Sequence, residues 1–209
     1  MHVKDLIRGL DAIIQDGISV KDFAVVTDTD SLTSKQILDV FIKNDIGKFE
    51  NDTIYFEADD KMKAAFLIIS NGADIEYVSE YLNWKDFEGL VAKILEEKGF
   101  TTIKNMILTK PRMEIDVIGI NHGIAMLIDC KHWKKLSDSI LNTIVEKQIK
   151  RVKNYIAKTN ETIAVPVIVT LYNEQLTFIN QVPIVPIQQF SSFIDEFYGN
   201  LDNVKVIEK

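Results

Sequence analysis

The chain has 209 residues, of which 46% are hydrophobic, so it can bury the core of one ordinary domain or two small ones. No apolar run approaches the roughly 18 residues of a membrane span, and acidic residues stand where a secretory signal would be basic, so we expect a cytoplasmic protein without membrane contact. The single cysteine, Cys130, excludes an internal disulfide and a zinc ribbon.

The net charge of −7 is unevenly distributed along the chain. Residues 1–83 carry 8 Lys and Arg against 16 Asp and Glu, a net charge of −8, whereas residues 84–209 carry 16 against 15. Within the second part, residues 131–158 hold 8 basic and 2 acidic side chains, a net charge of +6. This segment is either a solvated helix face or a contact for nucleic-acid phosphates. We therefore expect two domains, residues 1–83 and 84–209.

The first domain reads as mainly helical. Helical spacing of apolar residues predicts helices within residues 1–17, 31–45, 59–72 and 73–82, and Asn51-Asp52 predicts a hairpin turn within residues 46–58. A helix followed by a small hairpin suggests a winged helix-turn-helix, which would read DNA. A net charge of −8 disfavours strong phosphate binding, so we favour a protein-contact or dimerisation role.

The second domain opens with an amphipathic helix, "WKDFEGLVAKILEEKGF", residues 84–100. Glu88 lies on the border of its apolar stripe, where a carboxylate either reaches solvent or needs a partner. The stripe itself is expected to bury the following side chains: Trp84, Phe87, Val91, Ile94 and Leu95.

Three strands follow, in residues 101–108 and in "MEIDVIGINHGIAMLIDCK", residues 113–131. If His122-Gly123 is a two-residue turn, Asp116 lies opposite Asp129, and Glu114 opposite Lys131. Asp129 and Lys131 then share one face of the strand, while the side chain of Cys130 points to the other.

Two carboxylates facing each other require positive charge. About 5 Å apart, they repel by roughly 3 kcal/mol at an effective dielectric constant near 20. Oxygen ligands from Asp116 and Asp129, with a third acid nearby, are what Mg²⁺ or Mn²⁺ prefers. The alternative is a structural salt bridge from Lys131 to one aspartate.

The rest of the chain completes an α/β pattern. The stretch "IVEKQIKRVKNYIAK", residues 144–158, predicts a basic helix, residues 162–172 a buried strand and residues 182–187 a further extended segment. Trp133 either stacks on a base or covers the core. A closing helix in residues 188–199 is expected to bury Phe190, Phe193, Ile194 and Phe197.

In order, the helix with Glu88, a strand, the strand with Asp116, the strand ending in "DCK" and a basic helix resemble the PD-(D/E)xK nuclease core. This fold is that of many restriction endonucleases and of Mrr-like and Holliday-junction-resolvase-like enzymes. The resemblance covers roughly residues 84–199 and implies an αβββαβ core with a mixed central sheet flanked by helices, here preceded by the winged-helix-like domain.

The resemblance also implies roles for the site residues. Asp116 and Asp129 would bind the metal with the Cys130 carbonyl, Lys131 would orient or activate the attacking water, and Glu88 would assist from the helix. The catalytic residue Gln148 would lie near the scissile phosphate. Two departures stand out: Ile115 replaces the usual proline before Asp116, and the third acid, Asp129, is Asp where Glu is commoner.

The expected function is that of a Mg²⁺- or Mn²⁺-dependent DNA endonuclease, structure-specific and dimeric in one version, with RNA as the weaker alternative substrate. The competing hypothesis is a non-catalytic nucleic-acid- or protein-binding module that retains the fold. Side chains of the basic segment would carry the phosphate backbone past the site: Lys134, Lys135, Lys147, Lys150, Arg151 and Lys153.

Overall fold

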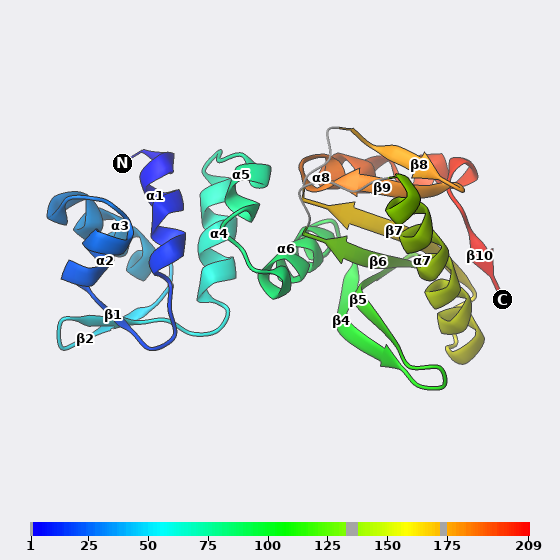
Figure 1. The fold of residues 1–209 in the computed structure, drawn as a ribbon, viewed down its shortest axis with the longest axis horizontal. Coiled ribbons are helices and arrows are strands. Elements are labelled where there is room, and N and C mark those ends of the chain that lie inside the picture. The colour runs from blue at the N-terminus through cyan, green and yellow to red at the C-terminus, as the bar shows by residue number, and fades with distance from the viewer. Residues whose placement is uncertain (1, 133–137, 172–174) are drawn as a thin grey trace. The chain divides into compact units, whose positions relative to one another are not determined.

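The computed structural model describes residues 2–132, 138–171 and 175–209 (Figure 1). The chain forms two compact units, of which the first ends at Asp86 and the second begins at Phe87. The sequence suggested a boundary after residue 83, just before the helix that now contains the division.

The first unit combines helices with a small sheet. Its elements, in chain order, are α1 (Val3–Gly9), η1 (Leu10–Ala12), β1 (Ile18–Ser19), α2 (Val20–Val26), α3 (Ser31–Lys43), β2 (Lys48–Glu50), β3 (Thr53–Tyr55), α4 (Asp60–Ser70) and α5 (Ile75–Ser79). The first helix was expected to continue towards Gly17, but it ends earlier. Neither β1 nor α2 was predicted from the sequence.

The hairpin of the first unit has the turn that its sequence predicts. Asn51 and Asp52 have φ values of 47° and 60°, the positive values that a two-residue type I′ turn requires at both positions. Strand β3 pairs antiparallel with β2 on one side and with β1 on the other. Together with α2 and α3 this gives the element order helix, strand, helix, helix, strand, strand.

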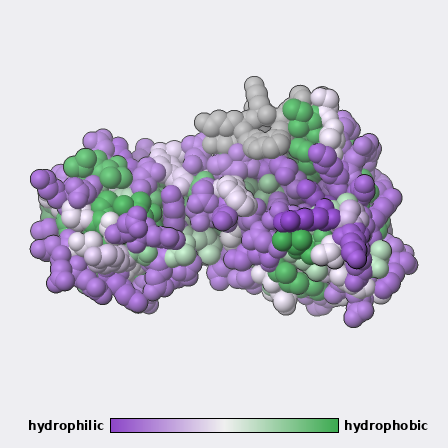
Figure 2. Space-filling model, turned by 60° about the horizontal axis from the view of Figure 1, so that its bottom comes forward, coloured by the Kyte–Doolittle hydropathy of each residue, from purple (hydrophilic) through white to green (hydrophobic). Residues whose placement is uncertain are grey.

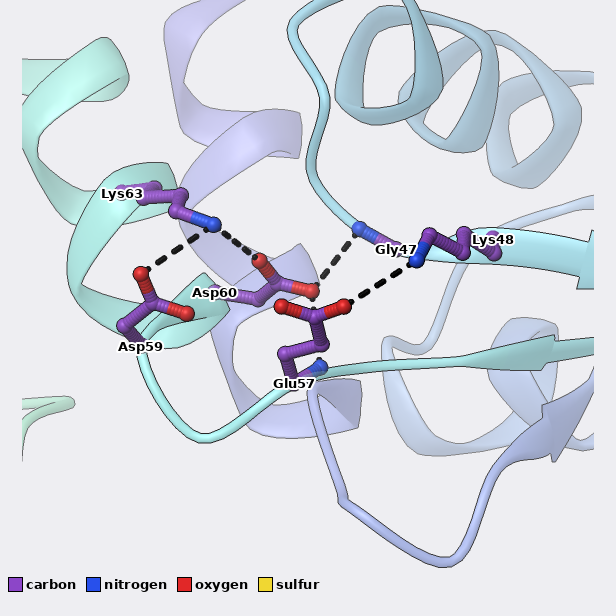
Figure 3. Close-up of polar contacts among 6 residues, drawn as sticks. All are labelled: Gly47, Lys48, Glu57, Asp59, Asp60 and Lys63. Carbon is purple, nitrogen blue, oxygen red and sulfur yellow. Dashed lines mark hydrogen bonds and ion pairs between the residues drawn. The ribbon is translucent and has the colours of Figure 1, made fainter.

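A buried carboxylate ties α4 to the hairpin. Asp60 is 1% exposed, and Figure 3 shows its carboxylate pointing at backbone amides and at the Lys63 ammonium. Its Oδ2 accepts hydrogen bonds from the amides of Gly47 at 2.9 Å and Glu57 at 2.8 Å, and its Oδ1 lies 3.0 Å from Lys63 Nζ. Part of this unit's negative charge therefore has a structural use, since it satisfies buried donors.

The second unit is built around one large sheet. Its elements are α6 (Trp84–Glu97), β4 (Thr101–Leu108), β5 (Met113–Asn121), β6 (Ile124–Lys131), α7 (Asp138–Lys158), β7 (Ile163–Thr170), β8 (Thr177–Ile179), β9 (Val182–Pro186), α8 (Ile187–Glu196), η2 (Tyr198–Asn203) and β10 (Ile207–Glu208). Within the described residues the strand order is β4-β5-β6-β7-β9-β8, with β10 added beside β7. Antiparallel pairs join β4, β5 and β6, and parallel pairs join β6, β7 and β9, so the sheet is mixed as expected.

The hairpin between β5 and β6 has the predicted turn and register. His122 and Gly123 have φ values of 47° and 76°, as a type I′ turn requires. The paired residues run from Asn121 with Ile124 to Val117 with Ile128. A one-residue slip would have exchanged the two faces of the strand, so this register decides which side chains meet at its far end.

Helices cover both faces of the sheet. On one face, Val152 and Tyr155 of α7 pack in one core cluster with Ala125 and Leu127 of β6. On the other, α6 approaches β5 so closely that a Cβ at Gly119 would lie 3.0 Å from Leu95. The ends of α6 and α8 are joined by an ion pair of 2.6 Å between the side chains of Lys98 and Asp195.

Most of the expected apolar stripes are buried, with two exceptions. Phe87, Val91, Ile94 and Leu95 of α6 are buried as predicted, but Trp84 is 56% exposed because it precedes the part of α6 that meets the sheet. On α8, Phe190 and Ile194 are buried, as is Phe197 after its end, while Phe193 is only half-buried beside a surface cavity. Strands β8 and β10 were not predicted.

Figure 2 shows that hydrophobic side chains reach the surface at separate places in a mainly hydrophilic exterior. In the first unit the most exposed are Val25 of α2, at 74%, and Leu32 of α3, at 68%. None of the described helices is both long and apolar enough to span a bilayer.

Candidate functional site

Asp116 lies where β5 becomes irregular. Its Oδ2 accepts a hydrogen bond of 2.8 Å from the backbone amide of Cys130 on β6. On the neighbouring strand β4, Asn105 stands where the partner of Asp116 would be, but the two residues are not paired, and Asn105 has a φ of 54°. Ile115 and Ile118 pack in one cluster although strict alternation would place them on opposite faces. The carboxylate is therefore fixed at a local break in the strand.

Asp129 lies near the end of β6 between two cations. It is 2% exposed, with its Oδ2 2.7 Å from Lys131 Nζ and its Oδ1 2.8 Å from Nη1 of Arg151 on α7. The predicted shared face of Asp129 and Lys131 is thus confirmed by their contact. The expected opposition of Asp116 and Asp129 is less direct, because the paired residues stop at Val117 and Ile128.

Gln148 links the sheet to Arg151. Its side chain is fully buried, Nε2 donates to the carbonyl of Leu127 at 2.8 Å, and Oε1 accepts from Arg151 Nη1 at 3.1 Å. The resemblance suggested that this glutamine would lie near the scissile phosphate. In the structure its amide bonds to the backbone of β6 and to the guanidinium that holds Asp129.

Glu88 reaches the same region from α6. It is 5% exposed, and its Oε2 is buried without a hydrogen-bond partner among the described residues. Burial, with the Asp116 carboxylate as the next cause, raises the pKa of Glu88 to about 7. A border position on the apolar stripe has therefore become an interior acid, which is costly unless a proton or a cation neutralises it.

Glu88, Asp116 and Asp129 form an acidic cluster, and the pKa values of its members follow from burial and mutual repulsion. Desolvation, and then the Asp129 carboxylate, raise the pKa of Asp116. Burial also raises the pKa of the Cys130 thiol well above its usual range, so it stays protonated. Three carboxylates face the two cations Lys131 and Arg151, which leaves a formal charge of −1 when all are ionised.

The donor chemistry fits a divalent cation with a preference for oxygen. Burial, followed by repulsion from neighbouring carboxylates, raises the pKa values of Glu88 and Asp116, and Glu88 Oε2 is a buried oxygen without a hydrogen-bond partner among the described residues. Among the described residues, however, no three Asp, Glu, His or Cys side chains already form a metal-holding group. Both oxygens of Asp129 are in contact with side-chain cations, those of Lys131 and Arg151.

The basic residues suggested by the sequence divide into three groups. Lys147, Lys150 and Lys153 are exposed along α7. Arg151 differs because its guanidinium is ion-paired within the cluster, with the side chain 24% exposed. Lys134 and Lys135 lie outside the described residues, as does the neighbouring Trp133.

Sequence reasoning missed two features of this region. Thr170 ends β7 beside Lys131 in the parallel register, is 2% exposed, and has a buried hydroxyl without a hydrogen-bond partner among the described residues. A hydroxyl at the end of "IAVPVIVT" was the available signal. Arg112 lines a cavity with basic residues of α7, and nothing in the sequence linked a turn residue to that helix.

Comparison with solved structures yields weak likenesses. Protein VC1899 from Vibrio cholerae is 12% identical, with a TM-score of 0.45, over 96% of this chain and 52% of that one. A protein of unknown function, AF1548, is 24% identical with a TM-score of 0.31, over 44% and 50%. Can2 from Sulfobacillus thermosulfidooxidans, solved with cyclic tetra-adenylate, is 13% identical with a TM-score of 0.38, over 78% and 44%. The chain thus spans about half the length of each.

Sequence comparison is more specific. An uncharacterized protein from Archaeoglobus fulgidus is 30% identical over 121 residues, which cover 56% of this chain and 93% of that protein. A family described as restriction endonuclease, of the Mrr catalytic type, matches residues 79–175. That range contains Glu88, Asp116, Asp129 and Gln148, and its helix, mixed sheet and basic helix form the fold expected of such nucleases. The chain therefore belongs to the restriction endonuclease family.

Proposed function

We propose that this chain is a divalent-metal-dependent DNA endonuclease that hydrolyses phosphodiester bonds. The observation that carries the proposal is the convergence of three buried or half-buried acids from three elements, Glu88 of α6, Asp116 of β5 and Asp129 of β6, beside Lys131. Membership of the restriction endonuclease family supports the same chemistry.

The proposed ligands for Mg²⁺ or Mn²⁺ are the carboxylates of Glu88, Asp116 and Asp129 and the carbonyl of Cys130. Such an ion, when bound, would activate the attacking water and neutralise charge on the phosphate. Lys131 Nζ, now 2.7 Å from Asp129, would exchange part of that contact for the phosphate or the water and supply a fixed positive charge. Glu88, whose pKa is raised to about 7 in the metal-free site, would assist from α6, directly or through a water.

Arg151 and Gln148 act in this proposal as positioning residues. The guanidinium holds Asp129 Oδ1 at 2.8 Å, and the buried amide of Gln148 fixes the guanidinium against the backbone of β6. This leaves Lys147, Lys150 and Lys153 as the described side chains of α7 that would contact the nucleic-acid backbone, with Lys134 and Lys135 as further candidates from the sequence.

For the first unit we propose a winged-helix-like module that contacts protein, including a second copy of the chain in a homodimer. Its order of helices and strands supports the winged-helix assignment. Val25, Val26 and Leu32 are exposed apolar side chains of α2 and α3, and residues 1–83 carry a net charge of −8. Apolar contacts with a partner suit such a surface better than phosphate binding does.

The second candidate is a non-catalytic binding module that retains the fold. One observation favours it: both oxygens of Asp129 are in contact with side-chain cations, which can replace a metal as the neutralising charge. In that case Lys131 and Arg151 are structural, and the basic helix α7 alone provides the nucleic-acid interaction.

Incubation with supercoiled plasmid, branched DNA and RNA, each with Mg²⁺, with Mn²⁺ or with EDTA, tests the two candidates. The nuclease proposal expects metal-dependent nicking or branch cleavage that Asp116→Asn abolishes. Asp202→Asn, which alters an exposed carboxylate of η2, is the matched control and should cut at the wild-type rate. Absence of cleavage on every substrate and with either metal would leave the binding module as the better account.

A further inference from the structure

A second site adjoins the acidic cluster on the α7 side of the sheet. It is a cavity of about 310 Å³ lined by Arg112, Met113, Glu114, Lys147, Lys150 and Arg151. Four cations and one carboxylate give its wall a formal charge of +3. Since one water occupies about 30 Å³ of liquid, the cavity can hold a phosphodiester group with part of its hydration.

Two elements build this cavity, and one residue binds them together. Lys147, Lys150 and Arg151 follow the three- and four-residue spacing that aligns side chains on one face of α7. Arg112 and Glu114 belong to the start of β5 and the turn before it. Lys158 Nζ, at the end of α7, donates hydrogen bonds to the carbonyls of Thr109 and Lys110 in that turn. These hydrogen bonds tie the turn before Arg112 to α7, so they fix the position of Arg112 relative to that helix.

Three of the four cations that line the cavity have side-chain N–H donors that form no ion pair with a carboxylate of the described residues. Among the described residues, Arg112, Lys147 and Lys150 form no ion pair with a carboxylate, and all three are exposed. Arg151 is committed through Nη1 to Asp129 and Gln148, so it joins the cavity to the acidic cluster. A wall with free guanidinium and ammonium donors around a hollow suits a phosphate, which accepts several charge-assisted hydrogen bonds at once.

We propose that this cavity binds a backbone phosphate of the nucleic-acid substrate, next to but distinct from the phosphate that is cleaved. The inference rests on the proposed function, because the acidic cluster defines the cleaved position. Glu114 in the cavity wall and Asp116 in the cluster are two residues apart on β5, which corresponds to about 7 Å along a strand. One nucleic-acid strand carries a phosphate every 3.4 Å of helix axis, so the bound phosphate lies one to three nucleotides from the cleaved bond, by this rough scale.

The first experiment measures binding without cleavage. The wild-type chain and the variants Arg112→Gln and Lys150→Gln are titrated in EDTA against a short fluorescent duplex and its single strand, from about 50 to about 200 mM salt. Each variant should flatten the slope of log affinity against log salt by about 0.9 on the duplex, which is about an eightfold loss of affinity near 0.1 M salt. Both residues are exposed, so the fold should tolerate the changes.

A lysine outside the basic helix separates a phosphate cavity from a general positive field. Lys93→Gln removes a charge from α6, on the other face of the sheet and outside the cavity. It should change the slope clearly less than the cavity variants. Equal effects of Lys93→Gln and Lys150→Gln, or unchanged slopes in the cavity variants, would overturn the proposal.

A scan of neutral linkages locates the phosphate. Methylphosphonate groups, placed one at a time along the strand, should weaken wild-type binding about eightfold at a single position near 0.1 M salt. In the Arg112→Gln/Lys150→Gln double variant that position should no longer matter. A wild-type scan without any sensitive position would overturn the proposal. So would competition by an acidic peptide that displaces the duplex from the wild-type chain and whose own binding depends on Arg112 and Lys150.

These measurements separate failure of the inference from failure of the proposed function. Cavity-dependent binding without any metal-dependent cleavage would keep the phosphate site and remove the nuclease. Metal-dependent cleavage, together with salt slopes that are unchanged in Arg112→Gln and Lys150→Gln, would keep the nuclease and remove the phosphate site. A wild-type chain that binds no nucleic acid at all would remove both.

Discussion

The backbone amide of Cys130 donates a 2.8 Å hydrogen bond to the side chain of Asp116 on the neighbouring strand. Through this bond the Asp116 carboxylate takes the place of a backbone partner where the pairing of β5 with β6 stops, at Val117 and Ile128. The carboxylate of β5 is therefore held against the end of β6, the strand that carries Asp129. One carboxyl oxygen of Asp116 is used for structure, and under the proposed function the other would bind the metal.

The proposed function and this hydrogen bond together assign two separable roles to Asp116. Asp116→Asn should keep an oxygen that accepts from the Cys130 amide, so its unfolding free energy should stay close to that of the wild type while cleavage is lost. Asp116→Ala should lose cleavage and, in addition, about 1–3 kcal/mol of stability, because the Cys130 amide loses its acceptor. Urea unfolding beside plasmid cleavage measures both. Equal stability of the two variants would contradict the structural half of this prediction.

Asp129 and Lys131 form a contacting pair, so their substitutions should not add. Asp129→Asn should remove most of the cleavage, and Lys131→Ala should slow the chemical step while leaving metal binding largely intact. DNA binding should survive both changes and should strengthen in Asp129→Asn, since one repulsive charge near the phosphate is gone. Single-turnover cleavage and metal titration distinguish the two variants. Cys130→Ala, which alters a side chain but keeps the backbone carbonyl and amide, should cut at nearly the wild-type rate.

The contact between Gln148 and Arg151 predicts a coupling energy. Gln148→Leu should destabilise the chain by about 1–3 kcal/mol, because the Leu127 carbonyl loses its buried donor. Arg151→Leu should leave Asp129 with Lys131 alone and slow cleavage. The double variant should lose less stability than the sum of the single changes, by about 0.5–3 kcal/mol, as expected of residues in one network. Strict additivity in a double-mutant cycle would show that the amide does not position the guanidinium.

Glu88 predicts an unusual dependence of stability on pH in the metal-free chain. Its pKa is raised from 4.5 to about 7 in the folded state, so the folded chain binds more protons than the unfolded chain between these values. Stability should therefore fall as the pH rises from about 4.5 to above 7, by at most about 3 kcal/mol from this group. Glu88→Gln should remove this loss, so it should be more stable than the wild type at pH of about 8 and similar to it near pH of about 4. Urea unfolding at both pH values in EDTA is the measurement. Parallel pH profiles of the two proteins would contradict the prediction.

Removal of residues 1–83 separates the acidic unit from the basic helix. Because that unit carries a net charge of −8, its removal should preserve non-specific DNA affinity or raise it. Joint substitution of Lys150, Arg151 and Lys153 should weaken binding and flatten its salt dependence. A truncated chain that no longer binds, beside a triple variant that binds normally, would make the first unit the DNA reader.

The sequence by itself determined the second unit's order of elements and the register of its central hairpin. Apolar runs of strand length, an amphipathic helix before them and a basic helix after them are local patterns, and the two-residue turn at His122-Gly123 fixes the partners along β5 and β6. Because strand pairing is periodic, that one turn also brought Asp116 near Asp129. The short strands β8 and β10 escaped, since too few residues carry any pattern.

Only the tertiary structure decided how the charges are used. Arg151 lies among basic residues of α7 that the sequence suggests as phosphate contacts. In the structure, however, the guanidinium of Arg151 contacts Asp129, while the neighbouring Lys150 lines a cavity. Glu88 could have reached solvent, but the close approach of α6 to the sheet at Gly119 carries it into the interior and raises its pKa. Arg112 likewise meets the basic side chains of α7, an element distant in sequence, only through packing. Charge acts over distances of several ångströms through space, and the distance between side chains of different elements is a property of packing, which local sequence patterns do not contain.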